Sequence, residues 1–357
     1  MRGEVVNAEG AVDQVGDKQQ AEANESRRAR ILRRILPWSL RGLGLLVLVA
    51  LAALGVDIIG AMELMFEARP AYLLPAFLVF CLTLFMRMIV WLILARWLRL
   101  GYRRLRSYVR LYLIGWSAGL GLPQGASPLA RAAVLASDKR SVGRGVIADI
   151  LDKLLVVATL GVLLVASAAY LSTESTRVLL GVGIGAAVIA GAIPLVLAGA
   201  WLFRPLIRRI LGYRWMETFA EDVSAALKEV RRAQPTHVAG LLLLAMIPSL
   251  LSVTALLLTS RALDVPLSFP VLMMASAAVG LATLLPISIN GLGPREGIFA
   301  AAVAGAGFSS EAGVALGLLW FAMATVTRLA AAAAWFMRSD DSGNEVPTAS
   351  VPEAGPD

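Results

Sequence analysis

The sequence predicts an all-α polytopic membrane protein with about seven transmembrane helices and two re-entrant broken helices. Its 357 residues are 58% hydrophobic and 16% charged, which is far from the balance of a soluble domain. The apolar residues form runs of spanning length, since a bilayer core about 30 Å thick needs about 20 of them per helix. Two of the apolar regions are interrupted by Pro and Gly. These three observations predict the fold class.

Seven apolar runs are long enough to span a bilayer, and two further pieces are too short. The predicted spans are residues 42–60, 72–97, 146–171, 178–203, 238–260, 269–289 and 313–337. The short pieces are residues 111–122 and 298–306.

Basic residues cluster beside the predicted spans, at residues 27–34, 96–110, 139–144 and 204–232. Lys and Arg in these positions mark the cytoplasmic side of a membrane. The formal net charge of +8 is therefore a topology signal, and we expect no nucleic-acid partner. The pattern predicts a cytoplasmic N-terminus and external loops at residues 61–70 and 172–177.

Three segments differ in composition from the spans. Residues 1–26 and 339–357 are polar and lack periodicity, and the second is acidic, so both tails are predicted to be disordered. Apolar and charged residues recur at helical spacing within residues 204–237, which predicts an amphipathic cytoplasmic helix. The transmembrane domain is predicted over residues 27–338.

The first interruption is the stretch GLPQGASPLAR at residues 121–131. The basic clusters on either side place both ends of residues 111–138 in the cytoplasm, and two full spans would need about 40 residues. A re-entrant hairpin with its tip near Pro123 fits the available length. Non-helical backbone at membrane depth is tolerated where protein or a water-filled cavity satisfies its polar groups, so the break predicts a cavity.

The second interruption is LPISINGLGPREG at residues 285–297, and the span count makes this segment enter from the external side. The two interruptions contain the same residue types in the same order, Pro123, Gly125, Pro128, Arg131 and Pro286, Gly291, Pro294, Arg295. Two broken segments of opposite orientation favour an inverted repeat around a site near the midplane.

A few charged residues lie within the apolar segments, where each costs several kcal/mol unless it is paired or hydrated. Asp149 and Lys153 are one helical turn apart, which predicts an ion pair on one helix face with Asp152 near it. The alternative is that this pair only locks helix packing. Arg87 lies in the middle of a predicted span. It marks a polar path, or alternatively its side chain reaches to the membrane surface or pairs with a carboxylate for folding.

Arg295 and Glu296 lie at the second break, and Arg328 lies in the last span. The glycine-rich turn around Arg295 offers backbone donors beside a guanidinium, which suits a phosphate. Arg131 follows the first break, and its alternative role is that of a cytoplasmic anchor.

The sequence argues against several kinds of chemistry. Cys81 and His237 are the only residues of their types, so no disulfide within the chain, zinc site or Ser-His-Asp triad is easy to build. A phosphate-binding loop of the GxxxxGK[ST] type does not occur. We therefore expect no metal and no cofactor.

The stretches GLGLPQGASPLARAAVLASDKRSVGRGVIADILDKLL and LLPISINGLGPREGIFAAAVAGAGFSSEAGVALGLLWFAMATVTRL resemble the two signature regions of the lysylphosphatidylglycerol synthase transmembrane-region family. This flippase-like domain also occurs in uncharacterised bacterial inner-membrane proteins. The first stretch departs from the family pattern, because GASP stands where the family has a Gly-Gly pair before the Arg. The resemblance covers most of residues 40–337. The second stretch matches through Pro286, Gly291, Gly293, Arg295, Glu296 and Gly297.

The resemblance implies a multi-pass protein of the bacterial plasma membrane that moves a phospholipid or a polyprenol-linked lipid between leaflets. Arg295 would contact the lipid phosphate, with Arg131 as its counterpart, while Asn290 would bond the headgroup and Glu296 would offset positive charge. Together with the buried charges, it predicts a headgroup path of Pro123, Arg131, Asp149, Asp152, Lys153, Pro286, Asn290, Gly291, Gly293, Arg295, Glu296 and Arg328.

We expect no synthesis of an aminoacyl lipid, because a transferase domain would be a large soluble unit and a short acidic tail follows the last predicted span. Two other classes stay open. One is a non-transporting accessory subunit of a cell-envelope lipid or glycan biosynthesis enzyme. The other is an intramembrane transferase acting on a lipid phosphate, for which no nucleophile and base pair is visible.

Overall fold

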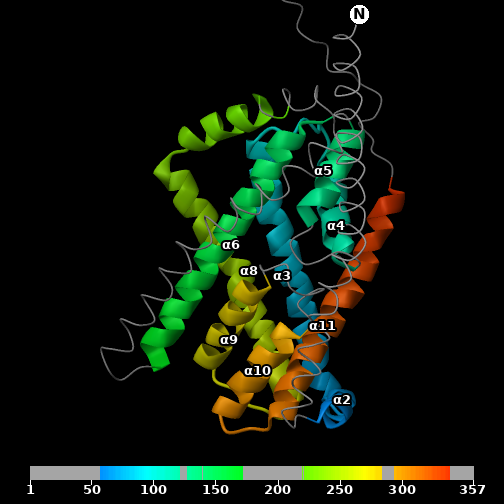
Figure 1. The fold of residues 1–357 in the computed structure, drawn as a ribbon, viewed down its shortest axis with the longest axis vertical. Coiled ribbons are helices and arrows are strands. Elements are labelled where there is room, and N and C mark those ends of the chain that lie inside the picture. Colours follow the sequence, from blue (N-terminus) through cyan, green and yellow to red (C-terminus); the bar gives the residue numbers. More distant parts are fainter. Residues whose placement is uncertain are drawn as a thin grey trace, which may run out of the picture.

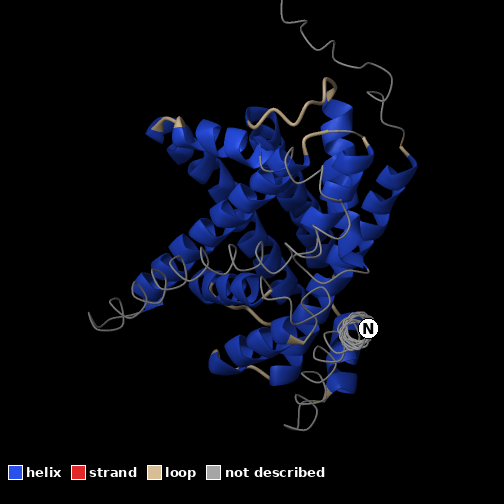
Figure 2. Ribbon diagram, turned by 45° about the horizontal axis from the view of Figure 1, so that its top comes forward, coloured by secondary structure: helices blue, strands red, loops and turns tan. Residues whose placement is uncertain are grey.

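The computed structural model describes residues 57–120, 127–138, 140–171, 219, 221–283 and 293–337. Every regular element among these residues is a helix (Figure 2). Both tails lie outside them, as do the predicted span at 178–203 and most of the one at 42–60.

Within the described residues, four helices are long and apolar enough to cross a membrane. They are α3 (Pro70–Trp97), α6 (Val142–Leu171), α8 (Pro235–Ala262) and the helix formed by α11 (Ser310–Ala332) with η2 (Ala333–Phe336). They confirm the predicted spans at 72–97, 146–171, 238–260 and 313–337. Of the predicted span at 269–289, the structure describes α9 (Phe269–Ala282), whose 14 residues are too few to cross a bilayer.

The four long helices run in two opposite directions, with α3 and α11 running one way and α6 and α8 the other (Figure 1). Helix α3 packs along α8, and Phe80 on α3 meets Trp320 on α11 edge to face with ring centroids 4.8 Å apart. The outward faces stay apolar: the exposed side chains include Leu74, Leu78, Phe85, Leu243 and Leu329. Such faces suit contact with lipid rather than water.

Short helices gather at the two opposite ends of the long ones. Helices α4 (Leu105–Ser117), η1 (Ala118–Leu120) and α5 (Ser127–Ser137) lie where α3 ends and α6 begins (Figure 1). Helices α9 and α10 (Pro294–Gly305) lie at the other end, where α8 ends and α11 begins, beside α2 (Ile58–Phe66). Each short pair thus starts and finishes at the same end of the molecule.

Two of the apolar cores among the described residues are larger than the others. One joins the end of α3 to α4, α5 and the start of α6, and its largest fully buried members include Trp91, Leu98, Leu111, Ile114 and Leu135. The other joins α6, α8, α9, α10 and α11 through side chains that include Leu163, Leu256, Leu272, Phe299 and Leu316.

The loop between α3 and α4 is tied to the end of α5 by a polar contact. The Tyr102 hydroxyl donates to Asp138 Oδ2 at 2.7 Å, and Arg110 Nη1 lies 3.4 Å from the same oxygen. Burial, and next the hydrogen bond to Asp138, raise the pKa of Tyr102 above its ordinary value. Residues 221–231 are helical, with Ala226 buried against the first core and Lys228 exposed, as the amphipathic pattern predicts.

Candidate functional site

Arg131 and Asp149 form a buried ion pair between two helices. The Arg131 guanidinium of α5 donates from Nη1 to Asp149 Oδ1 of α6, and the same oxygen accepts a hydrogen bond from Trp91 Nε1 of α3 at 2.7 Å. The residues are 6% and 3% exposed, so Arg131 is not a solvated anchor. The burial of both charges is offset by their pairing.

Helix α4 provides the space for this pair, and α3 and α4 together provide its aromatic surface. The Arg131 guanidinium carbon lies 4.8 Å from the Trp91 ring centroid and 5.1 Å from that of Tyr112. Such cation–π contacts are worth about 0.5–2 kcal/mol. A Cβ at Gly115 would overlap the Arg131 side chain, so the glycine admits the guanidinium against the helix.

Arg328 on α11 approaches α4 and η1 one turn further along. Its guanidinium carbon lies 4.6 Å from the Trp116 ring centroid, and a Cβ at Gly119 would lie 2.9 Å from its Nε. Gly115 and Gly119 are four residues apart, a rise of roughly 6 Å, so two glycines on one face admit two arginines. Among the residues that the structure describes, the buried Nε and Nη1 of Arg328 have no hydrogen-bond partner.

The start of α10 contributes a second group of buried charges. Gly293 precedes the helix with φ of 94°, a conformation that glycine adopts without steric cost. Pro294 then begins the helix, and Glu296 Oε2 accepts a hydrogen bond from the Gly293 backbone N–H at 2.5 Å. This carboxylate caps the helix from its third residue. Arg295 is 3% exposed and Glu296 is fully buried.

Close packing of α10 on α11 explains that burial. A Cβ at Gly313 would lie 2.5 Å from Ala300 Cα, and one at Gly317 would lie 3.1 Å from Glu296 Cα. The spacing Gly313-x-x-x-Gly317 lets two helix backbones approach closely, as small residues do in membranes.

Among the buried side chains described above, guanidinium groups outnumber carboxylates. Arg295 and Arg328 are close enough for their charges to act on one another. Two buried groups, one of Arg131 with Asp149 and the other of Arg295, Glu296 and Arg328, hold three guanidinium groups and two carboxylates, and together they are here called the arginine cluster. Guanidinium groups in a dry environment suit a phosphate or another oxyanion.

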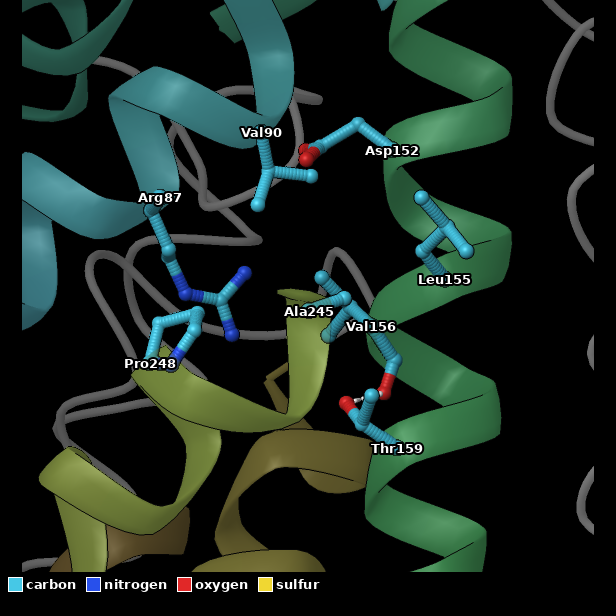
Figure 3. Close-up of a pocket in the computed structure, with 8 residues that line it drawn as sticks. All are labelled: Arg87, Val90, Asp152, Leu155, Val156, Thr159, Ala245 and Pro248. Atoms are coloured by element: carbon cyan, nitrogen blue, oxygen red, sulfur yellow. Dashed lines mark hydrogen bonds between the residues drawn. The ribbon is translucent and has the colours of Figure 1, made fainter. Parts of the chain in front are cut away.

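The predicted pairing of Asp149 with Lys153 is wrong. Asp149 pairs with Arg131, and the nearest carboxylate oxygen to Lys153 Nζ belongs to Asp152, at 3.8 Å. Spacing along one helix reveals only the neighbours on that helix, whereas the true partner comes from α5. Asp152 instead lines a separate pocket with Arg87 (Figure 3).

The structure thus pairs Arg131 with Asp149, joins Gly293 to Glu296, and places Arg295 near Arg328. Pro123, Pro286, Asn290 and Gly291 lie outside the described residues. Within those residues, no group of three His, Cys, Asp or Glu side chains is placed to hold a metal ion.

Sequence reasoning missed the residues that surround the arginines: Trp91, Tyr112, Gly115, Trp116 and Gly119. Aromatic residues in an apolar run are typical of packing and carry no charge signal. The four-residue spacing of Gly115 and Gly119 was the available clue, since it places both on one helix face.

Four long apolar helices around buried charges define a multi-pass membrane protein with a polar interior. The chain belongs to the family described as Lysylphosphatidylglycerol synthase TM region, whose family model matches residues 38–332. This match confirms the resemblance carried by the two signature stretches, and it is a match to a transmembrane region rather than to a catalytic domain. Comparison with curated proteins and with solved structures gave no match.

Proposed function

We propose that this protein carries a phospholipid or a polyprenol-linked lipid across the bilayer, with the lipid phosphate passing along the arginine cluster. The observation that carries the proposal is Arg328, a buried cation near Arg295 with two unpartnered nitrogens among the described residues. Membership of the lysylphosphatidylglycerol synthase TM region family supports a role in lipid handling.

The energetics favour an anionic ligand. A buried guanidinium without a counter-ion costs several kcal/mol, and a second guanidinium nearby adds repulsion. A phosphodiester carries one negative charge and accepts paired hydrogen bonds from Arg, so it removes both costs at once. The Arg131–Asp149 pair gives the lipid a second contact, because a phosphate is able to take the place of the Asp149 carboxylate beside Arg131.

The topology supports two entrances. Helices α4–α5 and α9–α10 start and finish at opposite ends of the molecule (Figure 1), and we infer that both pairs are re-entrant. The end with α4 and α5 carries Arg96, Arg99 and Arg110 and is assigned to the cytoplasm of a bacterial cell. Two such hairpins related by an inverted repeat would give the headgroup alternate access to the arginine cluster.

Lipid movement in vesicles tests the proposal. The purified chain is reconstituted with fluorescent phosphatidylglycerol, and an impermeant quencher follows how fast protected label reaches the outer leaflet. The unaltered protein is expected to speed this exchange, and Arg295→Ala to slow it roughly tenfold or more, the effect of losing a charge-assisted hydrogen bond. Arg261→Ala, at the exposed end of α8, removes the same charge outside the cluster and serves as the control.

Equal exchange by the unaltered protein and Arg295→Ala would remove the central contact. No acceleration with phosphatidylglycerol, other anionic lipids or polyprenol phosphates would overturn the transport function. Co-purification with a cell-envelope biosynthesis enzyme would then favour the accessory-subunit role.

A further inference from the structure

A small pocket between the middle parts of α3, α6 and α8 lies outside the arginine cluster. Its lining residues come from all three helices: Arg87, Val90, Asp152, Leu155, Val156, Thr159, Ala245 and Pro248 (Figure 3). Its empty space is about 220 Å³, including the part open to the outside. Because this space includes the part open to the outside, it admits only a small polar group.

The pocket presents opposite charges from opposite sides. The Arg87 guanidinium enters from α3 and the Asp152 carboxylate from α6, and both point into the space between the helices (Figure 3). Within the part of the chain that the structure describes, no ion pair joins them; Asp152 has Lys153 Nζ 3.8 Å away instead. The lining of the pocket thus offers the Arg87 guanidinium and the Asp152 carboxylate, which Lys153 shares, to a ligand that carries both a negative and a positive charge.

The hydroxyl groups at the edge of the pocket already have partners. Thr159 Oγ1 donates to the Val156 carbonyl at 2.9 Å, and Ser249 Oγ lies 2.9 Å from Thr159 Oγ1. Because these hydroxyl groups add no free donor, Arg87 and Asp152 decide which ligand the pocket binds. A mid-span Arg without a counter-ion is costly, and a bound anion relieves that cost.

The surroundings favour a lipid over a soluble ligand. Near Arg87 along α3, Leu82 and Phe85 are exposed, and near Pro248 along α8, Leu243 and Ile247 are exposed. These outward apolar side chains suit acyl chains, while the charged side chains that line the pocket suit a polar headgroup.

We propose that this pocket binds the zwitterionic headgroup of an amino phospholipid, with the phosphate at Arg87 and the primary ammonium at Asp152. The site does not rest on the proposed lipid translocation. It also differs from the arginine cluster in charge, because the cluster has positive charge in excess whereas one cation and one carboxylate line this pocket.

Native mass spectrometry of the purified full chain tests this site. Phosphatidylethanolamine, phosphatidylcholine and phosphatidylglycerol with identical acyl chains are offered in equal amounts, and retained lipid is counted. Phosphatidylethanolamine is expected to be retained roughly tenfold over phosphatidylcholine, whose quaternary ammonium cannot donate to a carboxylate. Asp152→Asn is expected to abolish this preference, and Arg87→Gln to lower retention of all three lipids.

The ratio of retained phosphatidylethanolamine to phosphatidylcholine is independent of the amount of protein, so it reports on the pocket even where a variant folds in low yield. Glu67→Gln replaces an exposed carboxylate by an amide, and Arg261→Gln replaces an exposed guanidinium by an amide. Both control variants should keep the preference for phosphatidylethanolamine. Arg295→Ala should also keep it, which separates this site from the translocation path. The proposal is overturned if the protein shows no preference for phosphatidylethanolamine over phosphatidylcholine, or if Asp152→Asn keeps that preference.

Discussion

The Asp149 carboxylate on α6 accepts a hydrogen bond from the Arg131 guanidinium on α5, and Trp91 on α3 donates to the same oxygen at 2.7 Å. One oxygen thus joins three helices in the apolar interior. Asp149→Asn keeps the shape but leaves Arg131 without a counter-ion, so we expect a loss of about 3–5 kcal/mol in the free energy of unfolding, measured by thermal denaturation in detergent. Adding Arg131→Gln should recover part of this loss. Losses that simply add would show that the two charges do not interact.

Gly115 is predicted to be intolerant of even one methyl group. A Cβ there overlaps Arg131, so Gly115→Ala should displace the guanidinium from Asp149 and destabilise the protein by about 1–3 kcal/mol in the same assay. Gly240→Ala on α8 is the control, because a Cβ there meets nothing within 4 Å. Equal melting temperatures for the two variants would refute the packing of Arg131 against α4.

Gly293 and Gly297 lie in the same motif and are predicted to differ. Gly293 has φ of 94°, so Gly293→Ala should cost about 1–2 kcal/mol of stability and loosen the start of α10. Gly297 lies inside the helix with open space around it, so Gly297→Ala should be neutral or stabilising by up to about 1 kcal/mol. The contrast is measured by thermal denaturation, and the reverse order would contradict the described turn.

The two breaks are predicted to open to opposite sides of the membrane. Each variant is made in a Cys81→Ser background and treated with an impermeant thiol reagent. The reagent should label Gln124→Cys in inverted vesicles, which expose the cytoplasmic side, and Asn290→Cys in right-side-out vesicles, which expose the external side. Labelling of both positions from one side would rule out the inverted arrangement.

Much of the fold follows from hydropathy, and the limits are set by contacts between helices. The predicted span at 72–97 and the observed α3 (Pro70–Trp97) differ by two residues, because Pro70 fits the first turn of a helix. Arg328 in the last span and Arg295 and Glu296 at the second break stood out in the sequence as charges in or beside apolar segments, and the structure buries all three. The partner of Asp149 did not, since Arg131 lies 18 residues earlier and reaches it only through the packing of α5 on α6.

The central claim is that Arg295 and Arg328 hold a lipid phosphate, and headgroup selectivity tests it most directly. Exchange is compared in vesicles for fluorescent phosphatidylglycerol and for a neutral glucosyl diacylglycerol with the same acyl chains, using the unaltered protein and Arg328→Gln. We predict that the unaltered protein accelerates the phosphate-bearing lipid alone. Arg328→Gln should lose roughly tenfold or more of that acceleration without a fall in melting temperature, because it removes an uncompensated buried charge. Equal acceleration of both lipids, or full activity of Arg328→Gln, would contradict a phosphate site in the arginine cluster.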